Sequence, residues 1–233
     1  MVDRKSLRLS ATLLFVGLLL TIITIIPHPV KGPGNDHTAV FAEYARSGNW
    51  TAIHLGEFAS TMIVVAGLIV LFFALNVSSG IPGWVARFAA VSAVVSLALF
   101  GVLQAVDGVA LKQAVDAWVS APSAEKAARF ASAESIRWLE WGVHSYWQFM
   151  WGLSFVLFAT VIVWTARIPR PIGYLMGLQG LAIIAQGWVV GLEGFSATLS
   201  VPVILDDISG LGWIIWLLII AWRMKEAVEA PAG

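Results

Sequence analysis

The fold is decided by residues 51–75, which read TAIHLGEFASTMIVVAGLIVLFFAL. Apart from His54 and Glu57 near its start, this stretch contains no residue that ionises. A helix needs about 20 mostly apolar residues to cross the hydrocarbon core of a bilayer. The stretch therefore predicts a membrane-spanning helix with two polar side chains close to one end.

Five further apolar segments of similar length accompany it. The chain of 233 residues is 59% hydrophobic and only 12% charged, with a mean hydropathy of +0.84; a soluble domain has about 25% charged residues. The fold class predicted is all-α, a polytopic membrane protein with six transmembrane helices in one bundle and no separate soluble domain. The six predicted spans cover approximately residues 9–26, 51–75, 84–106, 141–165, 172–192 and 203–222.

The longest connection, residues 107–140, is expected to carry additional amphipathic helices on the outer face of the bundle. It breaks at Pro122-Ser123, and Ser123 is suited to begin a second surface helix. Phe130, Ala133 and Ile136 repeat at helical spacing and form an apolar stripe. These helices are expected to lie on the membrane interface or to fold over the mouth of the bundle.

Composition also excludes several classes of partner. The formal net charge is zero, so the chain offers no basic surface for nucleic acid, and the lipid bilayer is the expected partner. The absence of cysteine excludes disulfides and thiolate metal sites. The oligomeric state is left open.

The distribution of lysine and arginine predicts the orientation. If both termini are cytoplasmic, the short inner loops hold Arg4, Lys5, Arg8, Arg87, Arg167, Arg170, Arg223 and Lys225. The six remaining basic residues fall in two longer outer connections, where acids are interspersed. The prediction is therefore that both termini face the cytoplasm and that the histidines and most acids face outward.

Two pairs of side chains are the candidate metal ligands. His54 and Glu57 lie three residues apart and Glu140 and His144 lie four apart, so each pair shares one face of its helix. Imidazole and carboxylate groups without thiols suit zinc, manganese or iron. His54, Glu57, Glu140 and His144 are therefore predicted to bind a divalent metal ion. Two neutral, hydrogen-bonded core histidines are the alternative interpretation.

Further polar residues are predicted to line the same outward-facing pocket because each lies near the outer end of its span. An ionisable group in a membrane span is costly and is a candidate for function. Helix capping or simple solvation is the competing interpretation for the acids near helix ends. The predicted lining residues are Gln104, Asp107, Gln148, Gln186, Glu193 and Asp207.

The fifth span carries glycine at every seventh position. Small residues at this spacing allow another helix backbone to approach closely in a membrane. The glycines predicted to pack against a neighbouring helix are Gly173, Gly180, Gly187 and Gly194.

Three stretches resemble a group of small bacterial six-helix membrane proteins of unknown function. They are LQAVDGVALK at residues 103–112, RWLEWG at 137–142 and GLEGF at 191–195. The resemblance implies a location in the bacterial cytoplasmic membrane. It implies no activity, so it assigns no role to any residue.

The sequence leaves several functions open. The leading hypothesis is a membrane-embedded metal-binding protein, or a metalloenzyme that acts on a lipid-like or periplasmic substrate. The second is a b-type haem protein with His54 and His144 as axial ligands, and the third is a proton- or cation-coupled transporter. A structural or assembly subunit is the remaining alternative.

Overall fold

The computed structural model describes residues 2–28 and 34–223 of the chain. Every element in this part is a helix, and six segments are long and apolar enough to cross a membrane. This confirms the predicted all-α bundle of six transmembrane helices. The segments are α1 (Arg4–Ile25), α3 (Trp50–Leu75), α4 with its continuation (Gly80–Ser120), α6 (Lys126–Thr165), α7 (Arg170–Glu193) and α8 with its preceding turn (Ala197–Arg223).

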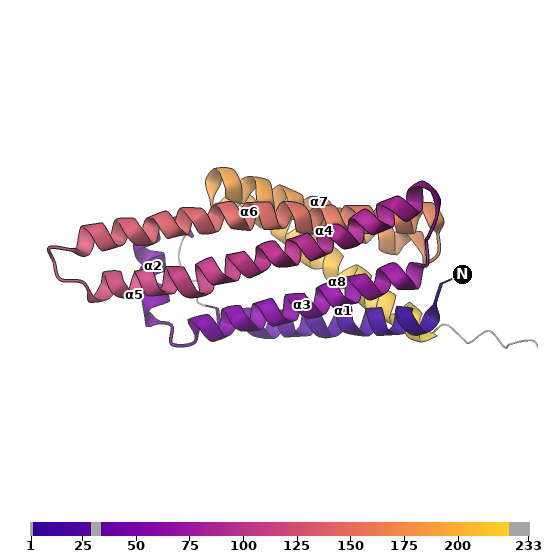
Figure 1. Cartoon of the computed structure of the whole chain (residues 1–233), viewed down its shortest axis with the longest axis horizontal. Coiled ribbons are helices and arrows are strands. Elements are labelled where there is room, and N and C mark those ends of the chain that lie inside the picture. Colours follow the sequence, from indigo (N-terminus) through magenta and orange to yellow (C-terminus); the bar gives the residue numbers. More distant parts are fainter. Residues whose placement is uncertain (1, 29–33, 224–233) are drawn as a thin grey trace, which may run out of the picture.

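The two ends of the bundle differ. The short helix α2 (His37–Arg46) and the helix α5 (Lys112–Ser120) lie at one end, called the α5 end below (Figure 1). Residues 2–4 and the tight turns at 76–79 and 166–169 lie at the opposite, N-terminal end. Each of these turns follows a residue in the left-handed conformation, Asn76 and Ala166, which ends the preceding helix.

Helices α1 and α3 pack closely because small residues face each other's backbones. A Cβ atom at Gly17 would lie 3.2 Å from the Ser60 carbonyl oxygen, and one at Gly67 would lie 3.0 Å from the Leu14 backbone nitrogen. The buried Ser10 hydroxyl donates to the Gly67 carbonyl oxygen at 2.8 Å. In lipid such close backbone packing replaces the hydrophobic driving force that joins helices in water.

The connection at residues 107–140 does not form separate helices lying on the interface. Helix α4 (Gly80–Ala105) continues through a π-helical turn, η1 (Val106–Leu111), into α5, and α6 runs unbroken for 40 residues. A helix of this length spans about 60 Å, whereas the hydrocarbon core is about 30 Å thick. Two helical rods, one formed by α4, η1 and α5 and the other by α6, therefore project past the bundle at the α5 end (Figure 1). Only residues 121–125 separate one rod from the other.

The projecting part has a small hydrophobic core of its own. Helix α2 packs against α5, and Phe41 and Tyr44 are buried against residues of the two rods. Trp50, at the start of α3, is only 1% exposed and joins the same cluster. This core fixes α2 and the start of α3 beside η1, which positions the polar residues described below.

Helix α8 (Ser200–Arg223) follows a single 3-10 turn, η2 (Ala197–Leu199), and runs obliquely behind the other helices (Figure 1). Near the N-terminal end it meets α1, where Arg8 Nε donates to the Ala221 carbonyl oxygen at 3.1 Å. Elsewhere α8 packs on α7. The first and last spans are thus joined at the N-terminal end.

Candidate functional site

A cavity of about 1240 Å³ lies inside the bundle toward the α5 end. Its walls come mainly from α1, α3, α4, η1, α6 and α8, and residues of α2, α7 and η2 complete them. Small-molecule pockets typically measure about 300–1,000 Å³, so this cavity is large enough for a sizeable ligand. Apolar side chains such as Leu18, Val64, Phe155 and Leu211 line one part, and histidines and carboxylates line another.

The cavity reaches the molecular surface between α1 and α8. Ile22 and Ile25 of α1 line it and are 42% and 54% exposed, and Leu211 of α8 lines it and is 40% exposed. These residues lie in spans and face the surroundings of the bundle, which in a membrane are lipid chains. The exposed part of the lining therefore includes apolar residues of two spans, with the exposed Asp207 of α8 beside them.

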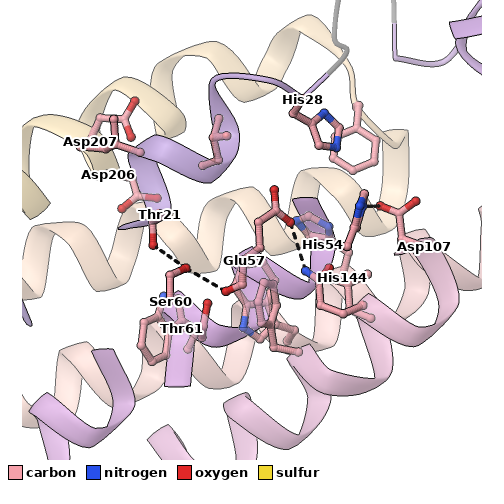
Figure 2. Close-up of a pocket in the computed structure, with 18 of the residues that line it drawn as sticks. Thr21, His28, His54, Glu57, Ser60, Thr61, Asp107, His144, Asp206 and Asp207 are labelled. Atoms are coloured by element: carbon pink, nitrogen blue, oxygen red, sulfur yellow. Dashed lines mark hydrogen bonds and ion pairs between the residues drawn. The ribbon is translucent and has the colours of Figure 1, made fainter. Parts of the chain in front are cut away.

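The π-helical turn η1 brings Asp107 against His54. His54 Nε2 lies 3.1 Å from Asp107 Oδ2 (Figure 2). Two side chains of α3 bond carbonyl oxygens of the turn, because Trp50 Nε1 donates to Asp107 and Thr51 Oγ1 donates to Gly108, both at 2.9 Å. A π-helical turn is rare and is frequently found at functional sites.

The hydrogen bonds of His54 fix the charge of this pair. His54 Nδ1 lies 2.8 Å from the Trp50 carbonyl oxygen, which can only accept, so Nδ1 carries a proton. Nε2 then either accepts a hydrogen bond from a protonated, neutral Asp107 or, as part of an imidazolium, donates a hydrogen bond to an ionised Asp107. In both cases the His54–Asp107 pair has no net charge.

A second charge pair lies within α6. Arg137 Nη1 donates to Glu140 Oε2 at 2.6 Å, and the two side chains are 4% and 1% exposed. The other carboxylate oxygen of Glu140 lies 3.7 Å from His144 Nδ1. Desolvation makes an isolated buried charge costly, so Arg137 is the partner that allows Glu140 to be buried and ionised.

Glu57 lies deeper in the cavity and has no cationic partner. No ion pair in residues 2–28 and 34–223 includes it, and its one recorded side-chain bond is from Gln104 Nε2 at 3.3 Å. In Figure 2 its carboxylate lies between the acids of α8 and the histidines. Ser60, one turn along α3, donates to the Glu57 carbonyl oxygen and accepts from Thr21 of α1.

On the α8 side, Asp206 is held by amide groups of α7. Gln179 Nε2 donates to Asp206 Oδ1 at 2.8 Å and Gln186 Nε2 donates to Oδ2 at 3.0 Å. A further hydrogen bond extends this network to α6, where the Gln148 amide donates to Gln186 Oε1 at 3.1 Å. The seven-residue spacing of Gln179 and Gln186 thus brings both amides to one carboxylate.

The cavity collects most of the polar residues predicted from the sequence, but it does not collect all of them. His54, Glu57, Gln104, Asp107, Glu140, His144 and Asp207 line it. Gln148 and Gln186 lie behind Asp206 and outside the lining. Glu193 lies away from it, at the exposed end of α7, where it accepts hydrogen bonds from Ser196 and Thr198.

The lining residues that were not predicted as site residues include Arg137, His28 and Asp206. Arg137 stands three positions before Glu140, so its spacing already allowed a pair on one helical face. His28 follows the apolar run of α1, and its ring centroid lies 5.5 Å from that of His54. Burial lowers the pKa of the His28 imidazole below its ordinary value, and the nearby His54 adds to this effect. Asp206 lies near the predicted start of the last span, where helix capping was one interpretation of the acids, but α8 begins six residues earlier.

The glycines of α7 lie against α6. A Cβ atom at Gly180 would lie 2.7 Å from the Gly152 carbonyl oxygen, and one at Gly187 would lie 2.9 Å from that of Ser145. Gly173 lies against Ala159 and Ile162 in the same way. Gly194 follows the helix with a φ of +66° and lies against the ring of Trp141.

The four predicted metal ligands lie around one cavity but are engaged with protein partners. His54 uses both ring nitrogens, and Glu140 bonds Arg137. Within residues 2–28 and 34–223, no group of three or more histidine, aspartate or glutamate side chains is arranged to hold a metal ion. Zinc, manganese or iron binding and haem binding remain predictions.

Comparison with known proteins gives one match. A family model described as a domain of unknown function, DUF4386, matches residues 9–221. The chain belongs to the DUF4386 family. The match includes four spans in full, most of the first and last spans, and every residue of the cavity, and it confirms the resemblance to a group without an assigned activity. No curated protein and no solved structure matches the chain.

Proposed function

We propose that this protein binds an amphiphilic molecule that enters its cavity from the membrane. The apolar tail would lie along α1 and α8, and the polar head would reach the histidines and carboxylates at the α5 end. The observation that carries the proposal is the combination of a volume of about 1240 Å³ with an apolar side opening. A water-soluble ligand has no need of such an opening.

The arrangement of the lining supports this division into head and tail. Leu18, Ile22 and Leu211 flank the opening, whereas His54 and Asp107 lie against η1, where the rods leave the bundle. Tail burial contributes about 0.8 kcal/mol for each methylene group removed from water. The polar head gives specificity, because its hydrogen bonds require the correct partners.

The orientation belongs to the same proposal. Arginine and lysine beside the helix ends favour cytoplasmic termini, which would place the α5 end outside. The protein would then take its ligand from the outer leaflet of a bacterial cytoplasmic membrane. The projecting rods and α2 would stand in the outer aqueous phase.

Metal binding is a second candidate, favoured by the number of carboxylates and imidazoles around one cavity. It ranks behind amphiphile binding because Glu140 already pairs with Arg137 and both ring nitrogens of His54 are occupied. Haem ligation by His54 meets the same obstacle. Elemental analysis and an absorption spectrum of the purified protein test both ideas, since either would require a stoichiometric metal or a haem band.

Native mass spectrometry of the purified protein tests amphiphile binding. We expect an adduct with the mass of a membrane amphiphile to survive extensive detergent exchange. Leu18→Trp places an indole in the cavity and should abolish the adduct. Leu19→Trp is the matched control, because Leu19 is 42% exposed on the outside of α1 and does not line the cavity.

The result that overturns the proposal is equally clear. If the protein carries no adduct, or if Leu18→Trp and Leu19→Trp retain it equally, the tail does not occupy this cavity. Thermal unfolding of both variants in the same detergent ensures that a lost adduct does not reflect a misfolded protein.

A further inference from the structure

The charges around the cavity do not cancel. His54 with Asp107 and Arg137 with Glu140 are pairs of zero net charge, by the proton and ion-pair arguments above. The remaining carboxylates include Glu57, Asp206 and Asp207, and none of the ion pairs in the described residues includes any of them. His28, whose pKa is lowered by burial, adds no positive charge at neutral pH. His144, beside Glu140, is the other imidazole of the lining, and acidic side chains still outnumber basic ones around the cavity.

Two buried hydrogen-bond acceptors in the lining lack donors. Gln104 is 9% exposed, and its Oε1 has no hydrogen-bond partner among the described residues. Asp107 Oδ1 is also buried without a partner, whereas Oδ2 faces His54. Buried polar atoms in folded proteins are nearly always bonded, and an orphaned one calls for a ligand or water. Both residues line the same cavity as Glu57, and each of the two oxygen atoms is covered by neighbouring protein atoms.

We infer that the head of the ligand is a primary ammonium group, so that the cavity binds a long-chain amine or an amine-bearing lipid. This inference rests on the proposed binding of an amphiphile and specifies the class of head. An ammonium group supplies the positive charge that Glu57 lacks. It also supplies three N–H donors, one for the Glu57 carboxylate and others for the Gln104 and Asp107 oxygens once these two side chains turn toward the cavity.

Glu57 and Gln104 are suited to act together. Gln104 Nε2 donates to Glu57 Oε2, and the amide oxygen of Gln104 is left without a hydrogen-bond partner among the described residues. The carboxylate attracts the cation, and the amide oxygen distinguishes an N–H donor from a methylated nitrogen. A hydrogen bond in which the donor or the acceptor is ionised is stronger than one between two neutral groups.

Aromatic side chains lie on the same wall. Trp147 and Phe100 line the cavity, with ring centroids 4.6 Å apart, and Trp151 and Trp213 line it further along. The face of a tryptophan ring attracts a cation within about 6 Å. The Trp147 indole N–H is buried and unpaired, so it offers one donor for an oxygen next to the head.

A series of photoreactive dodecyl probes with different heads tests the inference. The heads are a primary amine, trimethylammonium, alcohol and carboxylate, all presented to the purified protein in phosphatidylcholine nanodiscs. Competition of each unlabelled amphiphile against the photoreactive amine gives its relative affinity. We expect the amine to compete best, trimethylammonium to be weaker because it has no N–H donor, and carboxylate to be weakest.

Three variants test the roles of Glu57 and Gln104, and one of the three is a control. Glu57→Gln keeps the shape of the side chain and removes its charge, and it should weaken labelling by the amine about tenfold. Gln104→Leu should reduce the preference for amine over trimethylammonium. Glu125→Gln is the control and should change nothing, because Glu125 is exposed at the start of the projecting part of α6, where it pairs with Arg129.

The outcomes separate this inference from the proposal on which it rests. Equal competition by all four heads would overturn the ammonium assignment and leave amphiphile binding intact. Absence of labelling at residues of the cavity by the photoreactive probes of all four heads would overturn both. Displacement of the amine by zinc or manganese salts but not by dodecylamine would assign the carboxylates to a metal ion and overturn the ammonium head.

Discussion

At the scale of single residues, the molecule shows how ionisable groups are accommodated in an apolar bundle. Arg137 and Glu140 neutralise each other within one helix, and His54 and Asp107 do so between α3 and η1. Asp206 has no cation and is held by two amide groups. Glu57 has only one weak bond from the protein, and that distinction makes it the residue most suited to bind a ligand.

The Arg137–Glu140 pair gives a prediction at this scale. Arg137→Met should lower the free energy of unfolding by about 3–5 kcal/mol, because it leaves a buried carboxylate without its partner. The double variant Arg137→Met with Glu140→Leu should recover most of the loss, since both charges are then removed. Denaturation in mixed detergent measures all three proteins.

Equal stability of Arg137→Met and the wild type would show that Glu140 is not ionised in the bundle. Arg129→Met is the control for removal of an arginine from the same helix. Arg129 is exposed, and its pair with Glu125 should contribute less than about 1 kcal/mol.

At the scale of elements, η1 decides the geometry of the site. Its wider turn places Asp107 beside His54 while α4 continues into α5. The closeness of η1 to α3 depends on Gly108, because a Cβ atom there would lie 2.6 Å from His54 Cβ. Trp50 and Thr51 then bond the carbonyl oxygens of the turn.

Gly108→Ala should therefore destabilise the protein by about 1–3 kcal/mol through overpacking against His54. Gly142→Ala is the matched control, because Gly142 lies within α6 and a Cβ atom there meets nothing within 4 Å. Alanine should be neutral at that position or stabilise the helix by up to about 1 kcal/mol. Thermal unfolding of both variants measures the difference, and equal melting temperatures would contradict the close approach of η1 to His54.

At the scale of the whole molecule, the bundle is asymmetric along its length. The N-terminal end closes with short turns and the contact of Arg8 with α8. The α5 end carries the projecting rods, α2 and most of the ionisable side chains. Which end faces the cytoplasm follows from the basic residues and is a prediction.

Because the chain has no cysteine, single introduced cysteines report this orientation directly. Ser78 and Ser123 are exposed at opposite ends of the bundle. A membrane-impermeant maleimide should label Ser123→Cys in intact cells and Ser78→Cys only after the membrane is opened. The reverse pattern would place the cavity in the cytoplasmic leaflet and would overturn the predicted topology.

The sequence by itself determined the class of fold and the number of spans. These features depend on runs of apolar residues such as 51–75, and such local runs require helices in lipid whatever their neighbours are. The seven-residue repeat of glycine in α7 could also be recognised in the sequence, because helical periodicity places Gly180 and Gly187 on one face of the helix.

Only the tertiary structure decided which polar groups meet. The partnership of His54 with Asp107 depends on a π-helical turn that has no sequence signal, and that of Asp206 with Gln179 depends on the oblique path of α8. The unbroken course of α6 past the bundle was also missed, because an amphipathic stripe suits both a surface helix and a rod packed on another rod. Side-chain partners across helices depend on rotations and crossing angles, which the packing of the complete bundle sets.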